Sequence, residues 1–448
     1  MQIALAFLLF TVVCTVMAFR KHPIYGLAFY LATTYVFPQG RWWGAYLGET
    51  RWALIAATVT VLSVALAGKK LQPKPLWLAS GPAIVMTLFT IWLWLQMPLA
   101  LDLDDHLMGT VKYTKYVLAY WFFYRIMDSK DRVRDMLFLH VFGCSILGML
   151  AMLEGRSGGR LDGVGGPGID DANTLGMYLV TGTIIAFGLT LAQTGWRRIA
   201  ALGCMAICAQ GFILTNSRGA FLGLVAAWLV LAACKSIRHR RVFWGFAVVG
   251  VLGLAVLIDD AFVNRMFTIR DVASDSEEAD TSARSRVEVA KAQLLMFLDH
   301  PIGTGHRGTV VLSTRYLDAK WLTLDKSGNP DSAARSSHNS FLSALVEQGF
   351  IGAVLFICYV FWLVGAMLRV RRLGRAGADP QLITMAAAMC AAQSVVFVAG
   401  NTADYLMAEV QFWMYAGLVS SLAMAEASVP GRNPSPTSPA AGPKPATT

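Results

Sequence analysis

Arg218 is the residue of this sequence whose position is hardest to explain without chemistry. It stands between two apolar segments, directly after Asn216 and Ser217 and before Gly219. An arginine at that depth needs a partner or a water-filled cavity, and such residues are functional by default. A guanidinium that reaches back to the membrane interface is the structural alternative. The polar turn beside Arg218 favours contact with a ligand.

Arg284 and Arg286 form a second basic group, at the start of a helix predicted from Ser282 to Leu298. The apolar residues Val287, Ala290, Leu294 and Leu298 recur there at helical spacing. Helix N-termini attract anions, and guanidinium groups bind phosphate oxygens in bidentate fashion. The alternative is a solvated helix whose arginines form ion pairs with nearby acidic residues.

His338 is the candidate for proton transfer, together with its neighbour Asn339. A short helix is predicted to begin with Ser336 or Ser337 as its N-cap and to stop at Gly349. A histidine in its first turn feels the positive helix end and stays neutral, the form that accepts a proton. A polar residue at the membrane rim is the alternative.

Other polar residues on the same side of the chain give weaker signals. Asp102, Asp104, Asp105 and His106 resemble a metal-binding cluster, although a solvated loop explains them as well. Lys112 and Lys115 either add positive potential to an anion site or belong to an interfacial belt. The glycine-rich stretch 163–168, followed by Asp171 and Asn173, lacks the ending of a P-loop. We expect no metal and no nucleotide.

Composition places these residues in a membrane. Of the 448 residues, 56% are hydrophobic and 15% are charged, whereas soluble proteins average roughly 25% charged residues. This excludes soluble enzymes, disulfide-rich secreted domains and disordered proteins. The seven cysteines lie within or beside apolar segments, without a metal-binding pattern. Apolar segments are predicted at 2–18, 24–38, 52–67, 76–97, 111–127, 136–153, 174–193, 199–214, 219–234, 243–258, 350–368, 382–400 and 408–424.

The predicted fold is an all-α polytopic membrane protein with about 12–13 transmembrane helices and one long, partly helical loop. Lysines and arginines concentrate in alternate short loops, which the positive-inside rule places in the cytoplasm. The net charge of +10 is therefore explained by topology and not by nucleic-acid binding. The predicted regions are N-terminal helices at 1–258, an outer loop at 259–347, C-terminal helices at 348–425 and a disordered cytoplasmic tail at 426–448.

The basic residues and the histidine predict one reaction when taken together. Arg218, one of Arg284 and Arg286, and His338 all belong to the outer side and can converge beneath the long loop. Two arginines at membrane level suit a lipid-linked pyrophosphate, whose developing charge they stabilise as it leaves. A neutral histidine can take the proton from an attacking hydroxyl.

The ordered motifs of residues 130–425 resemble the O-antigen ligase and polymerase superfamily. The resemblance rests on Asp171-Ala172-Asn173, Ser217-Arg218-Gly219, Arg286 followed by Pro301-Ile302-Gly303-Thr304-Gly305, His338-Asn339-Ser340-Phe341-Leu342 and Glu347-Gln348-Gly349-Phe350-Ile351-Gly352. It implies a GT-C-like enzyme of the bacterial inner membrane with a periplasmic site and no cofactor. Such enzymes transfer a glycan from undecaprenyl pyrophosphate to lipid A–core with inversion, without a metal, in lipopolysaccharide biosynthesis.

The resemblance also implies the roles of individual residues. Arg218 and Arg286 would bind the pyrophosphate, with Arg284 as the alternative to Arg286, and His338 would be the base. Supporting residues would be Asn339, Asn216, Ser217, Asn173, Lys112 and Lys115. A polymerase that extends the glycan and a ligase that glycosylates protein share these motifs and this donor. A transporter of the lipid-linked glycan is the alternative from another class.

Overall fold

The computed structural model describes residues 1–68, 71–72, 74–155, 161, 163–234, 243–245, 248, 250, 281–323 and 333–431, with only the backbone for 281–283. Within these ranges the chain is helical, apart from one isolated β-bridge between Thr323 and Ala334. The prediction of an all-α fold is therefore confirmed. Most of the predicted segment 243–258, the stretches 259–280 and 324–332 of the predicted loop, and most of the tail at 426–448 lie outside the described residues.

The helices agree closely with the predicted apolar segments. Six of those described are long and apolar enough to cross a membrane, namely α1, α6, α7, α8, α15 and α16. The bundle consists of α1 (Gln2–Arg20), α2 (Ile24–Val36), α3 (Trp52–Ala67), α4 (Gly81–Leu95), α5 (Leu103–Ile126), α6 (Lys130–Glu154), α7 (Ala172–Ala192), α8 (Gly195–Leu214), α9 (Arg218–Cys234), α15 (Gly349–Arg375), α16 (Pro380–Ala399) and α17 (Glu409–Ala427). The protein is a polytopic membrane protein.

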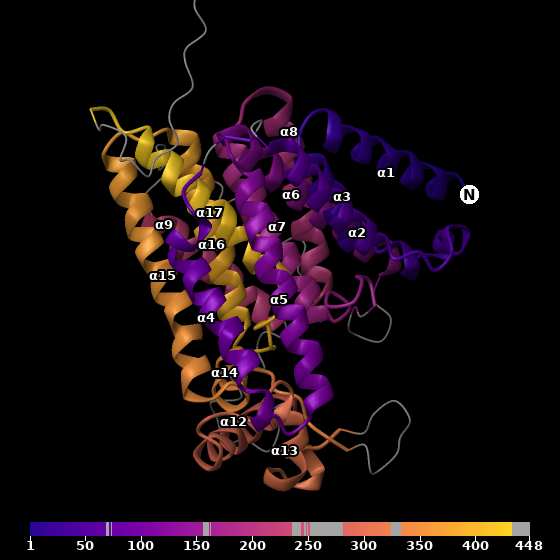
Figure 1. Ribbon diagram of the computed structural model, residues 1–448, viewed down its shortest axis with the longest axis vertical. Coiled ribbons are helices and arrows are strands. Elements are labelled where there is room, and N and C mark those ends of the chain that lie inside the picture. The colour runs from indigo at the N-terminus through magenta and orange to yellow at the C-terminus, as the bar shows by residue number, and fades with distance from the viewer. Residues whose placement is uncertain are drawn as a thin grey trace, which may run out of the picture.

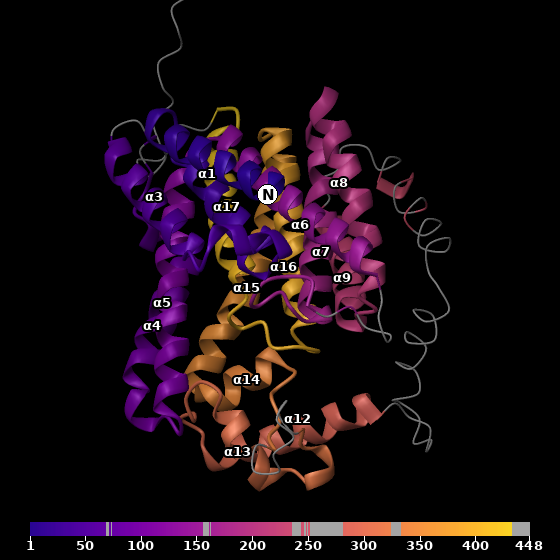
Figure 2. The ribbon, with the colours of Figure 1, turned by 90° about the vertical axis from the view of Figure 1, so that its right-hand side faces the viewer.

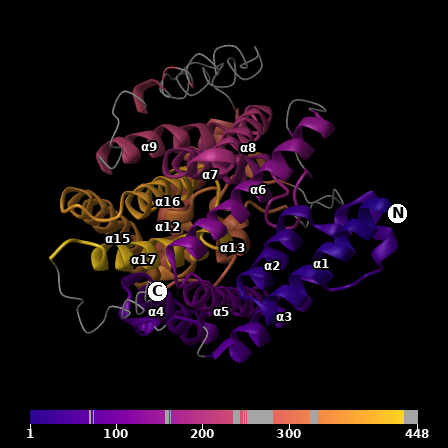
Figure 3. The same cartoon turned by 90° about the horizontal axis from the view of Figure 1, so that it is seen from above.

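Helices α7 and α16 form the centre of the bundle, between α9 on one side and α17 on another (Figure 3). Their close contact depends on small residues. A Cβ atom at Gly188 of α7 would lie 2.4 Å from the Cβ of Ala388 in α16. Small residues at such contacts allow the backbones of membrane helices to approach, and the gain is van der Waals packing.

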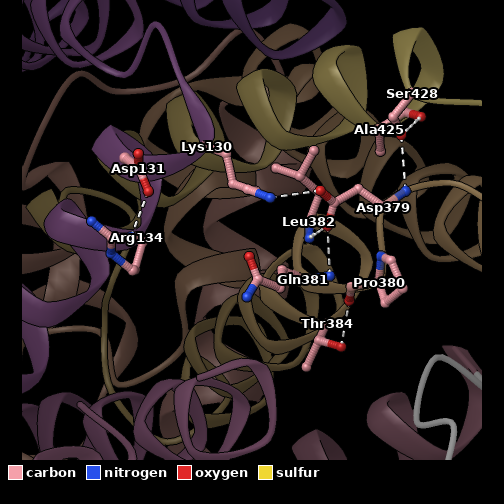
Figure 4. Close-up of polar contacts among 10 residues, drawn as sticks. All are labelled: Lys130, Asp131, Arg134, Asp379, Pro380, Gln381, Leu382, Thr384, Ala425 and Ser428. Carbon is pink, nitrogen blue, oxygen red and sulfur yellow. Dashed lines mark hydrogen bonds and ion pairs between the residues drawn. The ribbon is translucent and has the colours of Figure 1, made fainter. Parts of the chain in front are cut away.

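One end of the bundle, here called the Lys130 end, is closed by polar contacts between loops. The Lys130 ammonium donates to Asp379 Oδ2 at 2.7 Å, and the Asp379 carboxylate also caps α16 (Figure 4). Lys74 donates to the carbonyls of Tyr124 and Met127. These residues come from loops that the charge pattern assigns to one side. The structure confirms that these loops lie at one end of the bundle. That this end faces the cytoplasm stays a prediction.

Three further helices cover the opposite end, here called the α14 end (Figures 1 and 2). They are α12 (Thr281–Asp299), α13 (Gly308–Tyr316) and α14 (Ser340–Glu347). The predicted helix from Ser282 to Leu298 is thus confirmed as α12, and Pro301 follows its end. Helix α13 has no counterpart among the sequence predictions, because its nine residues carry only a short apolar run.

The predicted apolar stripe of α12 is exposed and not buried. Val287, Leu294 and Leu298 are exposed, whereas Ser285, Val289, Ala292, Gln293 and Met296 face the protein. The buried polar side chains have partners that the sequence does not reveal. Gln293 donates to Ser337 Oγ at 2.9 Å, and Ser285 Oγ accepts from Arg335 at 3.1 Å.

Helix α14 begins later than predicted. Its N-cap is Asn339, whose Oδ1 accepts from the backbone N–H groups of Phe341 and Leu342. The prediction of Ser336 or Ser337 as N-cap is therefore wrong. An asparagine cap competes well with serine, and here it bonds to the N–H groups that the helix leaves open. His338 consequently precedes the helix and is not in its first turn.

The close contact between α7 and α16 leads to a prediction about two glycines. Replacing Gly188 by Val forces the new side chain against Ala388 and should destabilise the protein by about 1–3 kcal/mol, as overpacking does. Gly203 of α8 has no atom within 4 Å of a Cβ position, so Gly203→Val is the matched control. Thermal unfolding of the two variants in the same detergent is the measurement. Equal melting temperatures would contradict this account of the core.

Candidate active site

The turn between α8 and α9 places Arg218 at the α14 end. Asn216 adopts a left-handed backbone conformation, with φ of 51°, which asparagine tolerates better than most residues. Ser217 precedes α9, and its Oγ accepts from the Ala220 N–H at 3.3 Å. Arg218 is therefore the first residue of α9, and only 6% of its surface is exposed. The predicted polar turn is confirmed, and its arginine is buried among protein atoms.

The start of α9 packs directly on the loop between α16 and α17. A Cβ atom at Gly219 would lie 1.8 Å from Thr402 Oγ1, so only glycine fits there. This absence of a side chain lets the backbone beside Arg218 approach the segment 400–405. The glycine after Arg218 thus has a steric reason, which the sequence alone could not give.

The N-terminus of α7 adjoins the same turn. Asp171 caps this helix by accepting from the N–H groups of Asn173 and Thr174. Asn173 Oδ1 accepts from Ser217 Oγ at 3.1 Å. The structure therefore brings together Asn173, Ser217 and Arg218, three of the predicted site residues, although 44 positions separate Asn173 from Ser217.

Ser340 joins α14 to the segment 400–405. Its backbone N–H donates to the Gly400 carbonyl at 2.7 Å, and its hydroxyl donates to the Ala403 carbonyl at 3.2 Å. The same hydroxyl accepts from the Tyr405 N–H at 2.6 Å. Ser340 is buried, so each of these bonds replaces one to water. The start of α14 is thereby fixed against the loop that Gly219 contacts.

The backbone at His338 is fixed by hydrogen bonds that its two neighbours in the chain, Ser337 and Asn339, form. Ser337 Oγ accepts from Gln293 of α12 and donates to the Asn339 carbonyl at 3.1 Å. The Asn339 side chain is used as the cap of α14. His338 itself is half-buried. Its backbone position is thus determined by α12 and α14 together.

The two arginines of α12 differ in their surroundings. Arg284 is exposed, whereas Arg286 is half-buried. Arg286 also acts electrostatically on Tyr405, the residue that donates to Ser340. Burial raises the pKa of Tyr405 well above its usual value, Asp171 raises it further, and Arg286 opposes the rise. The phenol therefore stays neutral, and Arg286 lies in electrostatic range of the groups around α7 and α14.

Lys112 and Lys115 belong to a different part of the α14 end. Both are exposed on α5. Lys112 acts electrostatically on His306, and the Lys112 ammonium lies 5.8 Å from the ring centre of Tyr116. The described contacts thus connect the turn of Asn216, Ser217 and Arg218 with Asn173, with the segment 400–405 and with the start of α14 beside His338 and Asn339, whereas Arg286 lies in electrostatic range of Tyr405. Lys112 lies apart from these residues and in electrostatic range of His306.

The predicted acidic cluster of 102–106 has structural partners. Asp102 caps α5 by accepting from the Asp105 N–H, and Asp105 forms an ion pair with Arg307 at 3.1 Å. His106 Nδ1 accepts from the His306 N–H, and its Nε2 donates to the Leu93 carbonyl. Both ring nitrogens of His106 are therefore engaged, which fixes one neutral tautomer.

Several residues of the site were not foreseen from the sequence. Tyr405 and Asp404 lie in the short polar stretch between α16 and α17, and Ser340 follows the histidine. A signal for them existed, because 401–407 interrupts two apolar segments on the predicted outer side. Glu347 is buried at the end of α14, and its Oε2 lies 3.5 Å from His306 Nδ1.

The sequence model of one family, described as O-antigen ligase, matches residues 201–357 of the chain. The matched region runs from α8 to α15 and contains Arg218, Arg286 and His338. This match supports the predicted resemblance to the O-antigen ligase and polymerase superfamily. It indicates a glycan-transfer activity of the O-antigen ligase or polymerase type. No curated protein is similar enough to the chain to count as a relative.

The pair of His306 and Glu347 leads to a prediction about pH. Hydrogen bonding to Glu347, and the charges of Glu347 and Asp404, raise the pKa of His306 despite burial and the opposing charge of Lys112. A raised pKa means that the pair stabilises the fold fully below the pKa of unfolded histidine, about 6.5, and that this stability is lost as pH rises through the folded value.

The variant His306→Gln should therefore lower the melting temperature most at acidic pH. The difference from the unaltered protein should shrink as the pH is raised from about 5 to about 9, across the range in which histidine titrates. His300→Gln, a change in the loop after α12, is the control. A difference that grows with pH would refute the charged pair.

Proposed function

We propose that this protein transfers O-antigen glycan from undecaprenyl pyrophosphate to lipid A–core on the periplasmic face of the bacterial inner membrane. The observation that carries the proposal is the network at the α14 end. It joins the turn of Arg218 to the N-terminus of α7, to the segment 400–405 and to the start of α14 after His338. Arg286 completes it from α12.

The roles of the arginines follow from charge and burial. Arg218 is buried at the first turn of α9, where helix N–H groups also favour an anion. Arg286 is half-buried and lies in electrostatic range of Tyr405. Two guanidinium groups in such a setting can hold the pyrophosphate and stabilise the charge that it gains. We assign Arg284 no part in pyrophosphate binding, because it is exposed.

The chemical step needs one base. The acceptor hydroxyl oxygen attacks the anomeric carbon of the glycan while its proton passes to the imidazole of His338. The bond from that carbon to the pyrophosphate oxygen breaks, and its electron pair leaves with undecaprenyl pyrophosphate. Attack opposite the leaving group inverts the anomeric centre. Asn339, Ser217 and Asn173 act by positioning His338 and Arg218.

A polymerase that extends the lipid-linked glycan is the second candidate. It uses the same donor and the same base, and the acceptor is another lipid-linked repeat. The family match is compatible with both, because the superfamily that the chain resembles includes ligases and polymerases. A protein O-glycan ligase differs again only in its acceptor. The acceptor that receives the glycan in a defined assay separates the three.

The first test combines purified protein with undecaprenyl-pyrophosphate-linked glycan and lipid A–core, in the presence of a chelator. Glycan should appear on lipid A–core, and His338→Ala should lower the rate by about 10²–10⁴-fold, the usual contribution of a general base. His300→Ala is the matched histidine control and should retain activity. Lengthened lipid-linked glycan would instead favour the polymerase. Normal transfer by His338→Ala would show that His338 is not the base.

The second test compares the two arginines of α12. Arg286→Lys keeps the charge but loses the bidentate fork, so transfer should fall on the order of 10²-fold, as when an oxyanion donor is removed. Arg284→Lys, two residues away on the same helix, should leave transfer nearly unchanged. The reverse order would reassign the pyrophosphate to Arg284.

A further inference from the structure

The outward face of α12 combines exposed apolar and basic side chains. Leu294, Leu295 and Leu298 are 50%, 54% and 69% exposed, and Val287 is 44% exposed. Arg284 and Lys291 are exposed on the same face, since spacings of three, four and seven residues align on a helix. Exposed leucines gathered on one helix face mark a surface that contacts a membrane or another protein.

This face continues into the membrane surface of the bundle. The C-terminal end of α12 meets the start of α15, where the Phe350 N–H donates to the Pro301 carbonyl. Leu298 and Ile302 are exposed on one side of this junction, and Phe350 and Ile351 on the other. From there α15 exposes a regular apolar stripe toward lipid: Val354, Ile357, Phe361, Val364 and Leu368.

The height of α12 agrees with the end of the apolar zone. Figure 2 shows α12 level with the lower ends of α4 and α5. Those ends also expose large apolar side chains, including Leu95, Leu103 and Met108. Exposed apolar residues on a membrane bundle face lipid, so the bilayer extends to about this level. The outward face of α12 is then at the boundary between headgroups and acyl chains.

We propose that α12 is an interfacial helix, with its outward leucines among the acyl chains and Arg284 and Lys291 among anionic phospholipid headgroups. Long lysine and arginine side chains on an apolar helix face can extend their charged ends to the headgroups while their aliphatic stems stay beside the leucines. The assignment also gives a role to Arg284, which lies near the start of α12, where acidic residues are usual. Under the proposed function, the opposite flank of α12 then holds Arg286 at the depth of a lipid-linked pyrophosphate.

Spin labels on single cysteines test this proposal without any activity measurement. The protein, with Cys358→Ser to remove its least buried thiol, is placed in nanodiscs of phosphatidylethanolamine and phosphatidylglycerol. Labels are attached through Leu294→Cys or Leu298→Cys. Phe361→Cys on the exposed stripe of α15 is the lipid control, and Asp318→Cys, beyond α13, is the water control. Collisions with oxygen and with a water-soluble nickel complex are compared.

Labels at 294 and 298 should collide more with oxygen and less with nickel than the label at 318, in the same sense as the label at 361. Nickel accessibility equal to that at 318 would place the face in water and overturn the proposal. Shielding from both reagents would mean that protein, such as a second copy, covers the face, and would also overturn it. Loss of transfer activity would not affect this readout.

Discussion

The three hydrogen bonds of Ser340 are the constraint on which the rest of the α14 end depends. They tie the start of α14 to the segment 400–405, whose Thr402 packs on Gly219 beside Arg218. Buried polar groups must find partners within the protein, and here the partners belong to separate helices. Because the bonds cross between elements, they couple the position of His338 to that of the arginine at the start of α9.

The two ends of the bundle use polar residues in different ways. At the Lys130 end, ion pairs such as Lys130 with Asp379 close the loops and leave helix ends capped. At the α14 end, an arginine is buried, a tyrosine is kept neutral, and helix N-termini of α7, α9 and α14 are placed near one another by their contacts. Burying a charged side chain in a membrane bundle is costly for stability, which is a reason to connect this end with function.

The sequence predicted the helices well because membrane segments depend on length and hydropathy, which are local properties. It also singled out Arg218, His338 and the pair Arg284 and Arg286 as site candidates from their residue types, and the family resemblance favoured Arg286 of the pair. It misplaced the start of α14 and did not show which face of α12 is buried, since both depend on partners distant in the chain. Gln293 can be buried because Ser337 accepts a hydrogen bond from it. The N-cap of α14 is Asn339 and not one of the two serines that precede His338. Ser340 and Tyr405 were missed for the same reason.

The central claim is that Arg218 and Arg286 bind one pyrophosphate beside His338, and a structure of the protein with bound undecaprenyl pyrophosphate in nanodiscs tests it most directly. The account predicts phosphate oxygens within hydrogen-bonding distance of both guanidinium groups, between the turn 215–219 and α12, on the side of His338. Pyrophosphate bound instead near Lys112 and His306, or at the Lys130 end, would contradict it.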